Sequence, residues 1–186
     1  YAAGHLLVAD YVNHRIRNIT PGGALPTLAG SGTKGHADGA GSAAQFDNPE
    51  GFAVDAAGNM LVADSFNHRI RKIDSSNGVT TTLAGSTYGS ADGTGTTASF
   101  NRPRGVAVSP DGGTVYVADN YNNRIRKIDT SNGVTTTLAG SGTPAFADGT
   151  GTAASFNDPF GVAVSPDGMT VYVADKNNHR IRQVTT

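Results

Sequence analysis

The 186-residue sequence contains no cysteine and no tryptophan, a single glutamate and only two methionines. The missing cysteine excludes a disulfide framework and any thiolate zinc site. No apolar run approaches the roughly 20 residues that a membrane-spanning helix requires. Neither sign of charge is in excess, since 14 Lys and Arg face 15 Asp and Glu. No global field therefore draws the chain to nucleic acid or to an anionic membrane.

Glycine, in contrast, is abundant, with 25 residues, and the hydrophobic fraction is a modest 37%. This balance favours many short strands joined by tight turns over long helices. One phrase is written four times in closely similar form, as in VADSFNHRIRKID from Val62 to Asp74. Its aspartates stand 54, 55 and 56 residues apart, at Asp10, Asp64, Asp119 and Asp175. A regular period of this length is the mark of a repeat architecture.

Each repeat predicts four β-strands. In the third copy they are expected at residues 105–109, 114–119, 124–129 and 134–140. PDGG and Asn132–Gly133 mark the turns, the second of which suits a hairpin with positive φ. The pattern predicts an all-β fold, a β-propeller of four-stranded antiparallel blades, with about four blades present and the first and last incomplete. Residues 1–186 are expected to form this single domain, with blades at approximately 1–30, 49–85, 103–140 and 159–186.

Each repeat is longer than the roughly 40–45 residues of a typical blade. The surplus lies in one connector, which spans residues 140–159 in the third copy. GTAASF in this connector is expected to form one short helical turn that places Phe156 in the core. Ile125 and Ile128 are three residues apart, although a flat strand buries every second residue. Either a bulge near Lys127 or burial of both sides of the strand would account for this spacing.

The phrase VADSFNHRIRKI, with Asp, then Asn-His, then an apolar residue, resembles the NHL repeat, and the preceding Pro49-x-Gly51-Phe-Ala-Val belongs to the same pattern. The resemblance covers essentially the whole chain, although Arg follows Asn-His and Asn123 replaces the histidine in the third copy. The resemblance implies a propeller. NHL propellers include protein-binding scaffolds, RNA-binding platforms, extracellular sensor domains and a metal-dependent lyase acting on peptidyl-hydroxyglycine. The fold therefore does not fix the function.

The repeated phrase is either a functional site with metal ligands or bases, or a structural feature of the fold. Histidine is a common metal ligand and titrates near neutrality, so His14, His68 and His179 are candidate ligands or bases. Equivalent residues of successive blades are spread around a ring, however, and Asn123 stands where a metal would need its fourth His. We therefore interpret the phrase as a structural ladder, and we expect no catalytic residue, metal or cofactor. The expected ladder residues are Asp10, Asp64, Asp119, Asp175, Arg15, Arg69, Arg124 and Arg180.

Nucleic acid is not an expected partner. Eight of the ten arginines belong to the repeated phrase, and arginine committed to bracing blades is unavailable for phosphate. DGTG, at 92–95 and 148–151, is a candidate calcium loop. Calcium takes about six or more oxygen ligands, usually with several carboxylates close together. Each copy supplies a single Asp, and we therefore interpret DGTG as a glycine turn.

The copies differ most at positions expected in exposed loops. In a propeller, the connectors from the fourth to the first strand and from the second to the third strand share one face, around the mouth of the channel. Aromatic rings, arginines and acids would gather there, which suits a partner-binding surface. Ordinary drift of exposed loops is the alternative explanation. The expected binding residues are Tyr11, Glu50, Phe66, Arg102, Arg104, Tyr121, Phe160 and Lys176.

The sequence begins and ends inside a repeat, so the first blade is expected to lack its first strand and the last blade its fourth. Open sheet edges invite pairing with another chain. We therefore expect a protein partner or self-association through these edges, and a biological unit larger than the chain, through missing blades, oligomerisation or filament-like assembly.

The leading functional hypothesis is a non-enzymatic propeller scaffold that mediates protein or glycan binding or self-assembly, at the cell surface or outside the cell. No membrane span is expected. Asn18-Ile19-Thr20 is a candidate glycan site if the chain is secreted. The alternative is a metal-dependent lyase or hydrolase, in which His36, Glu50 and Asp47 meet at the channel mouth.

Overall fold

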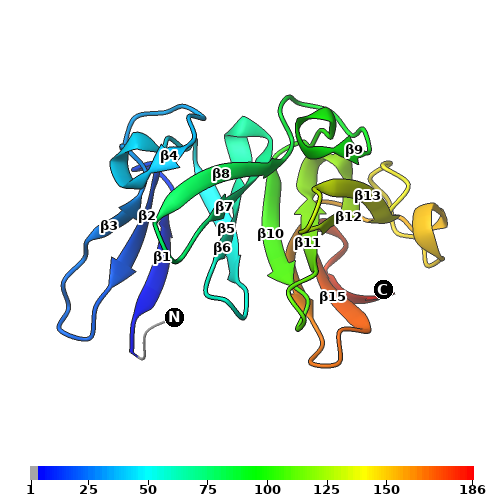
Figure 1. Cartoon of the computed structure of the whole chain (residues 1–186). Helices are drawn as coiled ribbons and strands as arrows, with labels where there is room; N and C mark the ends of the chain where they lie inside the picture. Colours follow the sequence, from blue (N-terminus) through cyan, green and yellow to red (C-terminus); the bar gives the residue numbers. More distant parts are fainter. Residues whose placement is uncertain (1–3) are drawn as a thin grey trace.

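The computed structural model describes residues 4–186, which form four antiparallel β-sheets standing side by side in an arc (Figure 1). This all-β arrangement of four blades is the expected β-propeller architecture. The first three residues of the blade expected at 1–30 lie outside the described residues. No helix within residues 4–186 has the length and hydropathy needed to cross a membrane.

The two central blades each contain four main strands and a two-residue outer strand contributed by the preceding connector. Blade 2 consists of β5 (Pro49–Val54), β6 (Met60–Asp64), β7 (Arg69–Ile73), β8 (Val79–Ala84) and β4 (Gly39–Ala40). Blade 3 consists of β10 (Pro103–Val108), β11 (Thr114–Asp119), β12 (Arg124–Asp129), β13 (Val134–Ala139) and β9 (Gly93–Thr94). The strands of blade 3 agree with the expected ranges to within about two residues at their ends.

The two terminal blades have three strands each. Blade 1 consists of β1 (Leu6–Asp10), β2 (Arg15–Ile19) and β3 (Thr27–Ala29). Blade 4 consists of β14 (Pro159–Val164), β15 (Thr170–Asp175) and β16 (Arg180–Thr185). By their place in the repeat, blade 1 holds the second to fourth strands and blade 4 the first to third, as expected.

Two sets of short 3₁₀ turns connect these strands. Those between the second and third strands are η2 (Ser65–Asn67), η4 (Asn120–Asn122) and η6 (Lys176–Asn178). Those in the long connectors are η1 (Gly41–Ala43), η3 (Gly95–Thr97) and η5 (Gly151–Ala153). After η5 the chain places Phe156 in the core with 1% of its surface exposed, which confirms the expected helical turn and its role.

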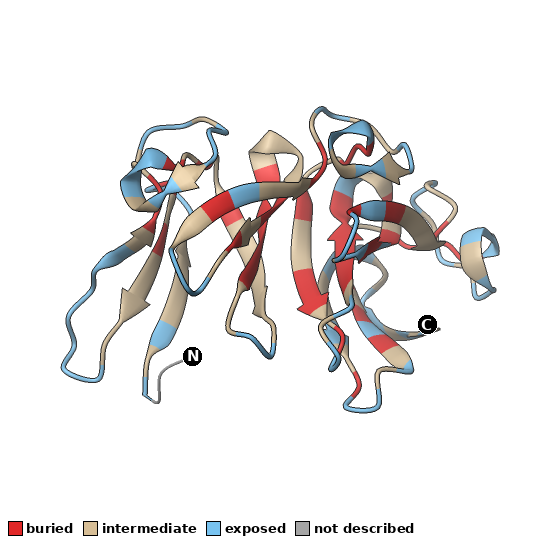
Figure 2. Cartoon of the chain, in the orientation of Figure 1, coloured by how far each residue is buried: buried red, intermediate tan, exposed pale blue. Residues whose placement is uncertain are grey.

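The hydrophobic core consists of three clusters, each lying between two neighbouring blades. Phe46, Phe100 and Phe156 take the same position in the three clusters and are almost wholly buried. Each comes from the connector that precedes the blade. Buried residues are concentrated along the strands and are sparser at the ends of the arc (Figure 2).

The third strand of blade 3 explains the three-residue spacing of its isoleucines. Ile125, Arg126 and Ile128 each have no exposed surface, so both sides of β12 are covered. Lys127 pairs regularly with Tyr116 on one neighbouring strand, and the register shift falls instead between Ile125 and Arg126, opposite β13. The extra residue at this irregularity is Leu138 on β13, so β12 itself is not bulged at Lys127, and burial of both sides of β12 accounts for the spacing.

The innermost strands β5, β10 and β14 run next to one another around the axis of the arc. Gly51 in β5 and Gly105 in β10 determine how closely each of these strands approaches the next. A Cβ atom placed on Gly105 would lie 2.5 Å from the carbonyl oxygen of Phe160, and one on Gly51 would collide with the carbonyl oxygen of Arg104. Glycine therefore permits the backbone of one blade to approach that of the next.

Candidate functional site

The histidines of the repeated phrase connect neighbouring blades. Each stands at the end of a short turn with positive φ, 56° at His68, and Asn123 takes the same conformation at 52°. In three blades this side chain accepts a hydrogen bond from a backbone N–H of the next blade. The pairs are His14 Nδ1 with Asn48 N at 3.1 Å, His68 Nδ1 with Arg102 N at 3.2 Å, and Asn123 Oδ1 with Asp158 N at 3.0 Å.

These contacts explain why asparagine substitutes for histidine. The position needs an acceptor on a side chain that tolerates positive φ, and asparagine supplies both. Burial, Arg102 and Arg69 all lower the pKa of His68 below its usual value of 6.5, which favours the neutral ring that can accept the bond. Among residues 4–186 no group of three or more His, Asp or Glu side chains is placed to hold a metal ion.

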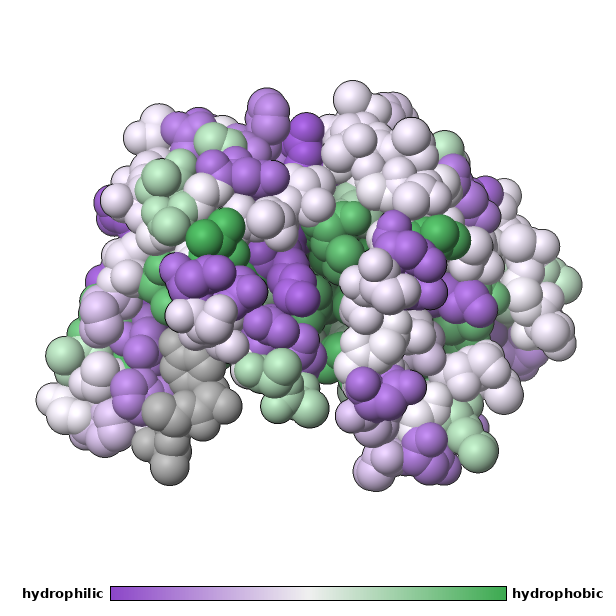
Figure 3. Space-filling model, viewed as in Figure 1, coloured by the Kyte–Doolittle hydropathy of each residue, from purple (hydrophilic) through white to green (hydrophobic). Residues whose placement is uncertain are grey.

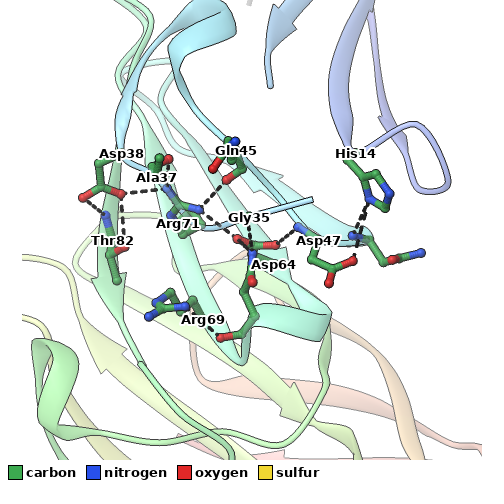
Figure 4. A network of polar contacts seen from close by, with 12 residues as sticks. His14, Gly35, Ala37, Asp38, Gln45, Asp47, Asp64, Arg69, Arg71 and Thr82 are labelled. Carbon is green, nitrogen blue, oxygen red and sulfur yellow. Dashed lines mark hydrogen bonds and ion pairs between the residues drawn. The ribbon is translucent and has the colours of Figure 1, made fainter. Parts of the chain in front are cut away.

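The aspartate of the phrase anchors a buried arginine, shown for blade 2 in Figure 4. Arg71 Nη1 donates to Asp64 Oδ2 at 2.8 Å and to the carbonyl oxygen of Gln45 at 2.9 Å. Its Nη2 donates to Ala37 O at 2.9 Å and to Asp38 Oδ1 at 2.7 Å. The last three partners belong to the connector that precedes the blade. The arginine therefore fastens this connector to the sheet.

The arginine that pairs with the aspartate is the second of its copy. These pairs are Arg17 with Asp10, Arg71 with Asp64, Arg126 with Asp119, and Arg182 with Asp175. The first arginines, which the sequence analysis placed in the ladder, make other contacts. Arg15, Arg69 and Arg124 donate to backbone carbonyls, and Arg180 lies over the ring of Phe146.

Burial raises the pKa of Asp119 to about 6, and the backbone N–H of Asn101, the Asn122 amide and Arg126 oppose this shift. The carboxyl group is therefore mainly ionised at pH 7. Arg126 itself has no exposed surface. A buried ion pair with several hydrogen-bond donors is tolerated while both partners are present. Removing one partner is strongly destabilising, because it leaves the other charge buried without compensation.

The second carboxylate of each network was not predicted from the sequence. Asp38, Asp92 and Asp148 belong to the recurring ADG triplet, and each accepts a hydrogen bond from the second arginine of the phrase in its blade. Asp92 also accepts a bond from Thr137 Oγ1. The signal was the recurrence of the aspartate together with that of the arginine, which glycine turns alone do not require.

The eight expected binding residues come from two kinds of segment. The turns after the second strands and the connector before β10 supply Tyr11, Phe66, Arg102, Tyr121 and Lys176, and the first residues of the innermost strands β5, β10 and β14 supply Glu50, Arg104 and Phe160. We call the surface that they form the loop face. Its first half connects blades 1 to 3. The rings of Tyr11 and Phe66 meet edge to face at 6.4 Å between centroids. The Arg102 guanidinium carbon lies 4.3 Å from the Phe66 centroid and 4.8 Å from the Tyr121 centroid. Arg102 Nη1 also donates to the Tyr121 hydroxyl at 3.1 Å.

The second half of the loop face continues to blade 4. Arg104 lies over the ring of Phe160 at 4.7 Å and near the carboxylate of Glu50 at 3.5 Å. Lys176 Nζ lies 5.5 Å from the centroid of the same Phe160 ring and pairs with Asp158 at 2.7 Å. Arg104 also lies 6.0 Å from the Tyr121 ring centroid, so the eight residues form one connected series of rings and charged groups. Burial raises the pKa of Glu50, with Arg104 and Arg102 acting against the shift.

A cavity of about 600 Å³ opens beside this series on the inner side of the arc. All four blades contribute to its lining, among others through Tyr11, Pro49, Glu50, Arg104 and Phe160. In the space-filling view, apolar surface lies in the hollows between the blades, and polar surface covers much of the rims (Figure 3). His36 does not line this cavity, so the three residues of the enzyme alternative, His36, Glu50 and Asp47, are not brought together there.

Comparison with protein families gives matches to one repeat model, described as the NHL repeat, at residues 46–73, 100–128 and 156–184. NHL repeat-containing protein 2 of Homo sapiens is 32% identical over 179 residues, which cover 89% of this chain and 25% of that protein. The bovine protein of the same name matches to the same extent. The chain therefore spans about a quarter of the length of these relatives.

Solved structures resemble the chain in fold. An auxiliary nutrient binding protein from Bacteroides ovatus matches with a TM-score of 0.76 and 22% identity, over 99% of this chain and 46% of that one. Virginiamycin B lyase from Staphylococcus aureus matches with a TM-score of 0.63 and 16% identity, over 100% of this chain and 53% of that one. At these identities the likeness concerns the fold alone.

Proposed function

The chain belongs to the NHL-repeat β-propeller family, and on this premise we propose that it is a non-enzymatic scaffold that binds a protein partner through the loop face. One observation carries the proposal. The residues at which the copies differ are joined in space into a single surface across four blades, beside a cavity that all four line. Rings and arginines of this kind supply most of the energy in protein interfaces.

The framework beneath this surface supports the same proposal. The repeated Asp, Arg and His residues are used within the sheets and between blades, so they hold the loops in place and leave the variable residues at the surface. Recognition loops carried on a rigid framework are the usual arrangement in binding proteins. The enzyme alternative has no such support, because its three residues are not assembled and the lyase likeness is one of fold.

The proposal is tested by selecting binders from a phage-displayed random peptide library on the immobilised chain. Enriched peptides are synthesised, and their affinities are measured by fluorescence polarisation for the wild type, Tyr121→Ala and Met169→Ala. Tyr121 lies on the loop face, whereas Met169 is an exposed apolar residue in the turn at the opposite end of blade 4. We expect Tyr121→Ala to weaken binding and Met169→Ala to preserve it. Equal binding to all three proteins would contradict the proposal.

Self-association is a second candidate role, and a specific observation on blade 4 favours it. Ile181 is 73% exposed, whereas its counterparts Ile16, Ile70 and Ile125 have no exposed surface. Together with Phe160 and His179 it lines an open depression of about 500 Å³ on the face of blade 4. Light scattering over a concentration series tests this role: association should be lost in Ile181→Asp, and a constant monomer mass in the wild type would contradict it.

The setting at the cell surface or outside the cell is also part of the proposal. It is supported by the sequon at Asn18, which lies half-buried near the end of β2, the middle strand of blade 1. Expression through a eukaryotic secretory pathway tests whether Asn18 accepts a glycan, with Asn18→Gln as the control. A shift in mass that persists in this variant would contradict glycosylation at this residue.

A further inference from the structure

Arg102 occupies a backbone conformation that does not suit arginine. Its φ is 49°, and the equivalent residues of the other repeats, Asn48 and Asp158, have φ values of 54° and 57°. Asparagine and aspartate tolerate this left-handed region, while other non-glycine residues are disfavoured there. The backbone N–H of Arg102 still donates to His68, as its counterparts do in their blades. The fold therefore requires the conformation at this position but not the arginine side chain.

The side chain of Arg102 is held in place but has donors left over. It lies against the rings of Phe66 and Tyr121, and one of its five N–H donors is used by the Tyr121 hydroxyl. A guanidinium that stacks on rings keeps its edge available for a planar anion such as a carboxylate. The rings thus fix the orientation of the group before any ligand arrives, which reduces the entropy lost on binding.

Arg102 is also the cation of the loop face whose charge is uncompensated. Arg104 faces Glu50 at 3.5 Å, and Lys176 faces Asp158 at 2.7 Å. Arg102 has no carboxylate within ion-pair distance among residues 4–186. The loop face therefore carries an excess of one positive charge at a defined point.

The cavity lies close to this charge. It is bounded by Tyr11, Pro49, Arg104 and Phe160, and by the glycines of the innermost strands. Tyr11 in its lining contacts the Phe66 ring, over which Arg102 lies. Arg104, also in the lining, lies 6.0 Å from the Tyr121 ring that Arg102 contacts. One extended segment of polypeptide can therefore reach the guanidinium with one side chain and the cavity with another.

We propose that the loop face binds an extended acidic polypeptide segment, with Arg102 receiving a carboxylate and the neighbouring cavity receiving an apolar side chain. This inference rests on the proposed protein-binding function and specifies its ligand. Arg102 is the residue that determines the preference for an acidic ligand, whereas the cavity contributes apolar contact.

The aromatic rings of the loop face argue against the other polyanions. Single-stranded nucleic acids bind by stacking their bases on open ring faces and by contacts between several cations and phosphates. Here Arg102 lies over Phe66 and Tyr121, and Arg104 and Lys176 lie near Phe160. A single uncompensated cation beside an apolar cavity is suited to one carboxylate rather than to a phosphate chain.

The test uses an array of synthetic dodecapeptides in which every sequence is present in two forms, one with Asp and Glu and one with Asn and Gln at the same positions. Affinities of the wild type and Arg102→Asn are then measured by fluorescence polarisation for the strongest pairs. We expect the wild type to prefer the acidic form by about tenfold, as one charge-assisted hydrogen-bonded contact provides. Arg102→Asn should bind both forms equally.

Arg102→Asn is a matched variant, because Asn48 already stands at this position in the preceding repeat. Its thermal midpoint should be no lower than that of the wild type, so lost preference cannot be attributed to unfolding. Equal binding of both peptide forms by the wild type would overturn this inference and leave the proposed function intact. No binding to any peptide would overturn both. Tighter binding to a twelve-residue oligouridylate than to any peptide would also overturn the inference, in favour of nucleic acid.

Discussion

Blade 3 and blade 1 contain the same phrase, but of these two blades only blade 3 forms the complete network of the phrase. Arg126 and Asp119 have fully buried side chains and are 2.8 Å apart. Arg17 and Asp10 have side chains that are 20% and 23% exposed and lie 3.3 Å apart. The difference lies in the connector. Arg126 donates to Ala91 and Asp92 of the preceding connector, whereas Arg17 donates to Leu25 of its own blade.

This difference teaches that a blade of this protein is not a self-sufficient unit. Its arginine and aspartate are buried by a segment that precedes it, and its histidine accepts a bond from the blade that follows. Stability in repeat proteins is approximately a sum of such neighbour terms. The same substitution should therefore have different effects in the central and terminal blades, in proportion to the neighbours it disturbs.

The largest contrast is expected for the aspartates of the phrase. Asp119→Asn removes the counter-charge of a fully buried arginine, which should lower the free energy of unfolding by about 3 kcal/mol. Asp10→Asn affects a partly exposed pair and should cost less than about 1 kcal/mol. Urea unfolding followed by circular dichroism measures both losses. Equal losses would show that the connector does not determine the strength of the network.

The axial glycines provide the next contrast, because Gly105 and Gly161 begin the same stretch, GVAVSPDG. A Cβ on Gly105 meets the carbonyl oxygen of Phe160 at 2.5 Å, while one on Gly161 meets only the Cβ of Ala174, at 3.7 Å. Gly105→Ala should therefore cost about 1–3 kcal/mol through overpacking. Gly161→Ala should change the free energy of unfolding by less than about 0.5 kcal/mol, as surface substitutions usually do. Urea unfolding of the two variants is the measurement, and a similar cost for both would contradict the packing argument.

The strands and the composition of the loop face could be predicted from the sequence because both follow from repetition. Shared positions fix strands and turns, as at Gly133, which has the expected positive φ of 73°. Differing positions mark the loops. The pairing of the arginines could not be predicted in this way. Arg124 and Arg126 are two residues apart and so project from the same side of the strand. The register of β11 and β12 places Arg124 directly opposite Asp119, but it is Arg126 that forms the ion pair with Asp119.

The backbone conformation of Arg102 also could not be predicted from the sequence. It precedes Pro103, and proline biases the residue before it toward extended backbone. The observed φ of 49° arises where the Arg102 N–H is bonded to His68 of the preceding blade. This contact joins residues 34 positions apart in sequence, so no local pattern reveals it. Local sequence determines the strands, whereas contacts between blades determine the loops.

The histidine bond between blades should contribute a smaller effect. His68→Ala removes the acceptor for the Arg102 N–H and should cost about 1 kcal/mol. His68→Asn recreates the arrangement of Asn123 and should cost less than about half of that. His179 is the matched position, because within residues 4–186 it accepts no backbone N–H bond from another blade, and His179→Ala should cost less than His68→Ala. Urea unfolding compares the three variants, and an equal loss in His68→Asn and His68→Ala would contradict the acceptor role.

The smallest expected effect is a pH dependence of the free energy of unfolding, which arises from the titration of His68. The pKa of His68 in the folded protein lies below its unfolded value of about 6.5, so the unfolded chain binds a proton more readily. The stabilisation associated with neutral His68 is therefore fully present above pH 6.5 and is lost as the pH falls toward the lower folded value. Unfolding free energies measured at pH 7.5 and 5.5 should differ more in the wild type than in His68→Asn, because asparagine does not titrate. An identical difference in both proteins would contradict the lowered pKa of His68 in the folded protein.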